Sequence, residues 1–152
     1  MKVGELIRQN IPTATFDTTL EKAVSMLAES DISGIPVVDN DGKLAGIVTE
    51  HDVMKLVLPA YEIVKPDESS KMDYDFLMAA RAEQVRNKPV SSFMTKDVVA
   101  IGEDYPLISA ISIMLMKRLK VLPVTREGAP IGIITRIDLA QAVLRLKDEK
   151  LQ

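Results

Sequence analysis

The feature that most constrains the fold of this chain is an internal duplication. A shift of 87 residues places Pro36 on Pro123, and after a predicted turn a shift of 86 residues places Gly46 on Gly132. The matches continue through predicted strands, helices and the turn, which indicates one supersecondary unit written twice. The residue missing from the second turn fits a surface loop, where a deletion costs little. A chain of 152 residues therefore reads as two small halves that share a core.

Hydrophobic periodicity predicts the same order of elements in each half. For the first half we expect a short helix over 3–10, a strand over 11–16, a helix that follows Thr18, strands over 35–38 and 44–49, and a helix over 50–58. Thr18 and Glu21 have the spacing of a capping box at the start of the longer helix. The predicted fold class is α+β, with a β-α-β-β-α repeat in each half.

Residues 59–89 interrupt the repeat, and we predict a linker there between domains over 1–58 and 90–152. The polar run 65–70 predicts a mobile loop, whereas apolar residues at helical spacing predict an extra helix over 73–86. Four acidic residues allow either a metal site or a solvated linker: Asp67, Glu68, Asp73 and Asp75. Their spacing matches no metal-binding loop that we can name, which favours the linker.

The predicted helix over 107–116 is apolar on nearly every side, with eight apolar residues in ten. Such a helix needs burial on more than one face. One face is expected to meet its own sheet and another to meet a second copy of the chain, which predicts a homodimer. The alternative is that the other half covers the surplus apolar surface. The tail over 146–150 is expected to be a fraying, solvated end.

Composition excludes several classes of site and partner. The chain has no cysteine, which excludes disulfides and cysteine-ligated zinc and suits a reducing cytoplasm. Its net charge of −3 gives no sign of a nucleic-acid partner. The chain has neither the apolar core of a signal peptide nor the run of about 18 apolar residues that a membrane helix needs. We therefore expect a cytoplasmic protein without a nucleic-acid or membrane partner.

Both halves carry one motif at a predicted strand-to-helix corner. Gly46-Ile47-Val48-Thr49-Glu50-His51-Asp52 corresponds to Gly132-Ile133-Ile134-Thr135-Arg136-Ile137-Asp138. Thr49 is placed to cap the next helix, which leaves backbone N–H groups and a partial positive charge beside Asp52. Such a corner can hold a phosphate on its amides and a sugar hydroxyl on its carboxylate. Thr-x-x-Asp is also a capping-box variant that only stabilises a helix start; the repetition favours the binding interpretation.

With these motifs, and with Ile35-Pro36-Val37-Val38-Asp39 and Leu122-Pro123-Val124-Thr125 ahead of them, the chain resembles a tandem pair of CBS domains, the modules named after cystathionine β-synthase. The resemblance covers both halves and leaves out only the linker. It implies a disc-like pair with pseudo-two-fold symmetry and two clefts between the halves. In the family, these clefts commonly hold AMP, ADP, ATP or S-adenosylmethionine.

The family's binding pattern is G-h-x-[ST]-x-x-D, where h is apolar, and both copies satisfy it. The resemblance implies that the aspartate takes the ribose hydroxyls, the threonine supports ribose or phosphate, and the apolar residue lies against the base. It implies a first cleft of Ile47, Thr49, Asp52, Thr95, Val99, Leu119 and Lys120. It implies a second cleft of Ile133, Thr135, Asp138, Pro12, Thr13, Ile32 and Ser33.

The resemblance also implies that the two clefts are unequal. Lys120 adds an ammonium near the expected phosphate position of the first cleft, whereas Ser33 takes that place in the second. Arg136 either compensates there or points into solvent, and His51 either touches a phosphate in the first cleft or lies on the surface.

Two positions depart from the repeat, and both concern the second cleft. The stretch Arg8-Gln9-Asn10 stands where the second half has Thr95-Lys96-Asp97, and Tyr105 stands where the first half has Thr18. The match to the family is therefore closer at the first cleft.

Three functions remain open. The doubled motif without a catalytic group beside it favours a regulatory module that binds an adenosine nucleotide and signals its occupancy to a partner, such as an enzyme or transporter in trans. A nucleotide-processing enzyme needs a base, nucleophile or metal, and the chain offers one histidine and no spaced ligand set. We expect no catalytic residue, metal or catalytic cofactor. The third possibility is a structural or protein-interaction pair whose clefts bind no ligand.

Overall fold

The computed structural model describes residues 1–58 and 73–151 and shows two β-α-β-β-α halves. The first half contains β1 (Ala14–Thr15), α1 (Leu20–Ser30), β2 (Gly34–Val38), β3 (Leu44–Thr49) and α2 (Glu50–Val57). The second half contains β4 (Ile101–Gly102), α4 (Leu107–Met116), β5 (Val121–Arg126), β6 (Ala129–Thr135) and α5 (Arg136–Lys150). In each sheet the first strand runs parallel to the second, and the second and third strands are antiparallel. The predicted fold class and element order are confirmed.

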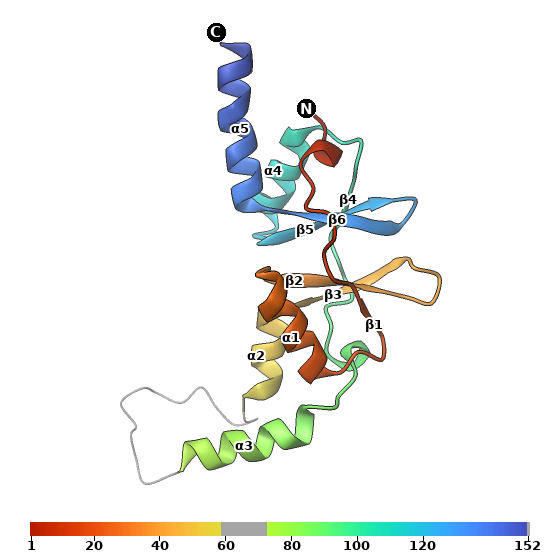
Figure 1. Cartoon of the computed structure of the whole chain (residues 1–152), viewed down its shortest axis with the longest axis vertical. Coiled ribbons are helices and arrows are strands. Elements are labelled where there is room, and N and C mark those ends of the chain that lie inside the picture. The colour runs from red at the N-terminus through yellow and green to blue at the C-terminus, as the bar shows by residue number, and fades with distance from the viewer. Residues whose placement is uncertain (59–72, 152) are drawn as a thin grey trace.

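The two sheets lie next to each other in the middle of the molecule, and the helices lie outside them (Figure 1). Helices α1 and α2 lie on the far side of the first sheet, and α4 and α5 on the far side of the second. The contact between the halves is apolar, since Val121 and Ile133 of the second half join the buried core of the first. Burial of these side chains from water holds the two sheets together.

The segments that precede the first strands are exchanged between the halves. The 3₁₀ turn η1 (Val3–Glu5) buries Val3 in the core of the second half. The turn η2 (Val90–Ser92) correspondingly buries Val90 in the core of the first half. Each half therefore needs a segment of the other to complete its core.

Paired backbone hydrogen bonds fix this exchange at two equivalent places. The Arg8 N–H donates to the Ile133 carbonyl at 2.8 Å, and the Ile133 N–H donates back at 3.2 Å. Thr95 and Ile47 exchange the same two bonds, each 2.9 Å long. The side chains of residues 8 and 95 are thereby placed beside the third strand of the opposite half.

This exchange shortens two of the predicted elements. The helix predicted over 3–10 is reduced to η1, because the chain turns to pair its backbone at Arg8 with the other half's sheet. The strand predicted over 11–16 is reduced to β1, which pairs only two residues with β2. The hydrophobic periodicity of one segment carries no information about the hydrogen bonds that it forms with a distant segment.

The start of α1 also differs from the prediction by one residue. Thr19 caps the helix, with its hydroxyl accepting from the Lys22 N–H at 3.2 Å. The hydroxyl of Thr18 accepts instead from the Thr15 N–H at 3.0 Å, in the turn between β1 and α1. The predicted box of Thr18 with Glu21 is therefore wrong, although a threonine cap is present.

Helix α3 (Tyr74–Val85) confirms the extra helix predicted over 73–86, and the Asp73 side chain caps it. The predicted loop over 65–70, with Asp67 and Glu68, lies outside the described residues. The tail over 146–150 does not fray, because α5 continues to Lys150 and Leu146 packs on the second core.

Helix α4 buries one face against its own half and leaves another face uncovered. Leu107, Ala110 and Met114 are buried, whereas Leu115 is 72% exposed and Met116 is 79% exposed. The first half therefore does not cover the surplus apolar surface. None of the helices in the described ranges combines the length and apolar character needed to cross a membrane.

The close approach between the halves predicts that Gly46→Ala destabilises the protein. A Cβ at this position would lie 2.8 Å from the Thr95 carbonyl oxygen and 2.9 Å from the Met94 sulfur. The carbonyl is fixed by the backbone bridge, so we expect a loss of about 1–3 kcal/mol in urea unfolding, as for an overpacked core.

Gly102→Ala is the matched control. A Cβ there would meet only the ring of Tyr105, at 3.3 Å or more, and that side chain is 56% exposed and free to shift. Equal stability of Gly46→Ala and wild type would show that the contact between the halves is looser than described.

Candidate functional site

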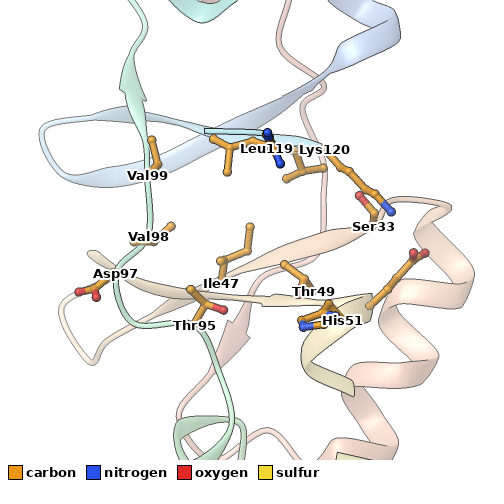
Figure 2. Close-up of a pocket in the computed structure, with 13 residues that line it drawn as sticks. Ser33, Ile47, Thr49, His51, Thr95, Asp97, Val98, Val99, Leu119 and Lys120 are labelled. Carbon is orange, nitrogen blue, oxygen red and sulfur yellow. The ribbon is translucent and has the colours of Figure 1, made fainter. Parts of the chain in front are cut away.

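A cavity of about 320 Å³ lies between the halves beside β3. This volume falls at the lower end of the roughly 300–1,000 Å³ range of small-molecule sites. Figure 2 shows that Val99, Leu119 and Lys120 lie on one side of the cavity, and Ile47, Thr49 and Thr95 on the other. Six of the seven residues predicted for the first cleft therefore line one cavity, although they come from three separate stretches of sequence.

The seventh predicted residue, Asp52, does not line this cavity. Its carboxylate accepts from the backbone N–H of Thr49 at 2.9 Å and from the Thr49 hydroxyl at 3.0 Å. The Thr95 hydroxyl also donates to it, at 3.0 Å to Oδ1 and 3.1 Å to Oδ2. Asp52 therefore orients the hydroxyls of two residues that line the cavity, while its own side chain lines a neighbouring pocket together with Lys55 and Met94.

The Thr49–Asp52 corner is also a complete capping box. The Asp52 N–H donates to the Thr49 hydroxyl at 3.2 Å, while the Asp52 carboxylate accepts from the Thr49 N–H. The corresponding corner of Thr135 and Asp138 forms the same box at the start of α5. The structural interpretation of the motif is thus confirmed in both halves, and it leaves the cavity-lining face of Thr49 available to a ligand.

The cavity combines an apolar floor with charged edges. Seven further lining residues join the six predicted ones: Ser33, Glu50, His51, Asp97, Val98, Arg118 and Val121. Aliphatic side chains such as Val98 and Leu119 can contact the face of a flat ring. Arg118 and Lys120 are exposed cations at the edge and can attract a phosphate.

Five of these lining residues were not expected from the sequence: Glu50, Asp97, Val98, Arg118 and Val121. Val98 and Val121 adjoin predicted site residues, so their alternation along the chain could have indicated them. Arg118 lines the cavity because it follows α4 in the left-handed conformation, with φ of 55°. His51, for which two interpretations were open, lines the first cavity although its side chain is exposed.

The second predicted set is brought together only in part. Ile32, Ser33 and Thr135 line a more open groove of about 790 Å³ on the helix side of the molecule. Lys120 and Arg136 line it too, and Arg136 also donates to the Leu119 carbonyl at 2.6 Å.

Four residues predicted for the second cleft do not line this groove: Pro12, Thr13, Ile133 and Asp138. Ile133 is fully buried, which removes the expected contact with a base. The chain turns at Asn10, whose φ of 59° is left-handed, just before Pro12 and Thr13.

Arg8 holds the carboxylate of the second corner. Its Nε lies 3.2 Å from Asp138 Oδ1 and 3.0 Å from Oδ2, and its Nη2 lies 3.0 Å from Oδ1. Nη2 also lies 3.4 Å from the Thr135 hydroxyl. Burial raises the pKa of Asp138, but hydrogen bonds from Arg8 and Thr135 outweigh it, so this pKa lies below its ordinary value.

Within the described ranges, no group of three histidine, aspartate or glutamate side chains is gathered where it could bind a metal. The candidate site is thus a cavity lined by hydroxyls and aliphatic side chains, with two cations, Arg118 and Lys120, and two carboxylates, Glu50 and Asp97. Its chemistry suits reversible binding of a small anionic molecule with a flat apolar part.

Comparison with known proteins identifies the family of this chain. The family model for the CBS domain matches residues 3–59 and 90–145. The chain belongs to the CBS domain family. The resemblance stated from the two motifs is confirmed, and so is the fold of a tandem CBS pair.

Relatives carry this pair alone or within a larger protein. A CBS domain-containing protein of Dictyostelium discoideum is 32% identical over 95% of this chain and 92% of its own length. The inosine-5'-monophosphate dehydrogenase of Methanocaldococcus jannaschii is 32% identical over 91% of this chain, which corresponds to 23% of the enzyme. The structure of Arabidopsis thaliana CBSX2 in complex with AMP has a TM-score of 0.72 at 23% identity, covering 96% of this chain and 98% of CBSX2.

The Arg8–Asp138 pair predicts a stability difference that disappears in acid. Because the folded pKa of Asp138 lies below its unfolded pKa, the pair stabilises the fold above the unfolded value of about 3.9. This contribution is lost as the pH falls through the folded pKa. Arg8→Gln should therefore cost up to about 1 kcal/mol at neutral pH and little once the pH has fallen through the folded pKa of Asp138.

Urea unfolding across this pH range measures the difference. Lys96→Gln is the control, because it removes an exposed positive charge at the equivalent of position 9 in the other half. A difference for Arg8→Gln that stays constant into acid would mean that the pair contributes through packing of the arginine stem and not through charge.

Proposed function

We propose that this CBS pair is a regulatory module that binds an adenosine nucleotide in the first cavity and transmits its occupancy to a partner. The observation that carries the proposal is the gathering of Thr49, Thr95 and Lys120 around one cavity with an aliphatic floor. The hydroxyls and the carboxylate behind them suit a ribose, the aliphatic side chains suit a purine, and the cations suit a phosphate. That CBSX2 was solved in complex with AMP supports this class of ligand.

The site residues proposed for this role are the seven of the first cleft. Asp52 accepts hydrogen bonds from ribose hydroxyls once the Thr49 and Thr95 hydroxyls rotate away. Those hydroxyls are neutral and each carries one proton, so their redirection costs little more than the bonds that they give up. Ile47 and Leu119 enclose the base. We propose no catalytic residue, metal or catalytic cofactor.

The choice among AMP, ADP and ATP depends on the cations at the edge of the cavity. Lys120 lines both the cavity and the neighbouring groove, and the groove also contains Arg136. A phosphate chain longer than that of AMP would extend toward this shared edge. We propose an adenosine nucleotide as the ligand class, with S-adenosylmethionine as a competitor in the test.

A structural pair without a ligand is the alternative function. The observation that favours it is that both carboxylates already serve complete capping boxes. The two functions differ in what removal of Asp52 does. If the carboxylate only caps α2, its loss affects stability and leaves partner binding unchanged.

We also propose that the module forms a homodimer through α4 and α5. These helices leave a groove lined by Ile111, Met114, Leu115, Arg136, Leu139, Ala140, Val143 and Leu144. Leu115 and Leu144 are more than half exposed at its edges. A second copy would bury this surface, and a regulated enzyme or transporter in trans would then contact the paired modules.

Asp52→Ala is expected to weaken AMP binding about ten- to a hundredfold, because a hydrogen bond to a charged group contributes about 1.5–3 kcal/mol. Calorimetric titration of the ligand-free protein with AMP, ADP, ATP and S-adenosylmethionine measures the effect.

Asp138→Ala is the matched control for this titration. It removes the carboxylate from the same position of the equivalent capping box, together with the ion pair to Arg8, and leaves the residues of the first cavity in place. The control should keep the wild-type affinity of the first cavity. If the wild-type protein binds none of the four ligands, the proposed function is wrong.

Leu115→Lys is expected to convert a dimer to a monomer, because it places a charge in the proposed apolar interface. Light scattering over a range of concentrations gives the mass. Phe76→Lys is the control, since Phe76 is also more than half exposed but lies on α3. A monomeric wild type at high concentration, or a dimer that survives Leu115→Lys, would contradict the interface.

A further inference from the structure

The two repeats place the same carboxylate beside chemically different partners. Residues 8 and 95 are equivalent in the repeat, and each is held against the third strand of the opposite half by a pair of backbone hydrogen bonds. In the first cleft this position supplies the Thr95 hydroxyl to Asp52. In the second it supplies the Arg8 guanidinium to Asp138. One position therefore decides what each carboxylate contacts.

The contacts of Asp138 leave little capacity for a ribose. A carboxylate has about four acceptor positions. Oδ1 is contacted by Arg8 Nε and Nη2, and Oδ2 by Arg8 Nε and the Thr135 N–H. Two ribose hydroxyls can bond to Asp138 only if the guanidinium leaves, whereas at Asp52 they compete with neutral hydroxyls.

Arg8 is also held in place by its surroundings. Its backbone is anchored to Ile133 on both sides of the bridge, and its side chain lines the groove together with Thr135. The Asp138 side chain is only 15% exposed, so water replaces the arginine poorly. Charge-assisted pairs with two parallel contacts are among the stronger hydrogen bonds in proteins.

With Arg8 in place, the position expected to face the base is also less exposed in the second cleft than in the first. Ile133 is completely buried, whereas its equivalent Ile47 retains 8% exposure and lines the first cavity. The second cleft thus differs from the first in that its carboxylate is paired with a cation and its isoleucine has no exposed surface.

We propose that Arg8 occupies the ribose position of the second cleft as an internal substitute for a ligand, so that each chain binds one adenosine nucleotide and not two. This inference rests on the proposed function of the first cavity. It makes Arg8 the residue that sets the stoichiometry of the module. We expect that replacing Arg8 with threonine, the residue at the equivalent position 95, opens the second cleft.

Arg8→Thr tests the proposal because it gives the second corner the partner that the first corner has. Calorimetric titration with AMP should give one site per chain in wild type and two in Arg8→Thr. Affinity at the second cleft should rise at least about tenfold, since its carboxylate no longer needs to release a cation. The additional site should disappear in Arg8→Thr combined with Asp138→Ala.

Arg126→Thr is the matched control. Arg126 contacts Glu103 through Nε at 2.6 Å and Nη2 at 2.7 Å, so this change also breaks a two-contact arginine–carboxylate pair, but outside both clefts. It should leave one site per chain. Arg8→Gln, which keeps part of the side-chain stem, serves as the second opening variant if Arg8→Thr unfolds.

The outcomes separate this inference from the function on which it rests. Two sites in wild type, or one site in both folded Arg8 variants, would overturn the proposal while leaving binding at the first cavity intact. If wild type binds no AMP and Arg8→Thr binds AMP at one Asp138-dependent site, the role of Arg8 is supported and binding at the first cavity is refuted. If neither wild type nor either Arg8 variant binds AMP, both this inference and the proposed function are wrong.

Discussion

The structure depends on the exchange of two short segments between its halves. Residues 2–8 complete the core and sheet of the second half, and residues 89–95 complete those of the first. The exchange works only where a glycine allows it, because a Cβ at Gly132 would lie 2.6 Å from the Arg8 carbonyl oxygen. Each half of the structure consequently includes a segment that the sequence repeat assigns to the other half. The same bridges decide which side chain meets each strand-to-helix corner.

The corners show how one set of hydrogen bonds can serve both stability and binding. The side chains of Thr49 and Asp52 form hydrogen bonds with backbone N–H groups at the start of α2. Without such caps, these N–H groups would have no partner within the helix. Besides the Thr49 backbone N–H, the donors to the Asp52 carboxylate are the hydroxyls of Thr49 and Thr95, which can rotate. A capping box and a ribose site are therefore compatible at one carboxylate, provided that no fixed cation competes for it.

The two corners are alike in backbone and unlike in electrostatics. Both form the capping box, and both lie next to an exchanged segment. The difference is a neutral hydroxyl at residue 95 against a permanent positive charge at residue 8. A guanidinium keeps its charge at any physiological pH, so the second corner remains paired wherever Asp138 is ionised. In a duplicated fold, one side chain is enough to make two equivalent places behave differently.

The sequence by itself determined the duplication, the α+β repeat, the extra helix α3 and six of the residues that line the first cavity, because motif spacing and periodicity record short-range constraints. It also marked residues 8–10 as a departure from the repeat, without singling out Arg8. Only the tertiary structure decided that residues 3–10 are not a helix, that Pro12 and Thr13 miss the groove, and that Arg8 reaches Asp138. Those outcomes depend on hydrogen bonds between residues more than a hundred positions apart, and no local pattern contains their partners.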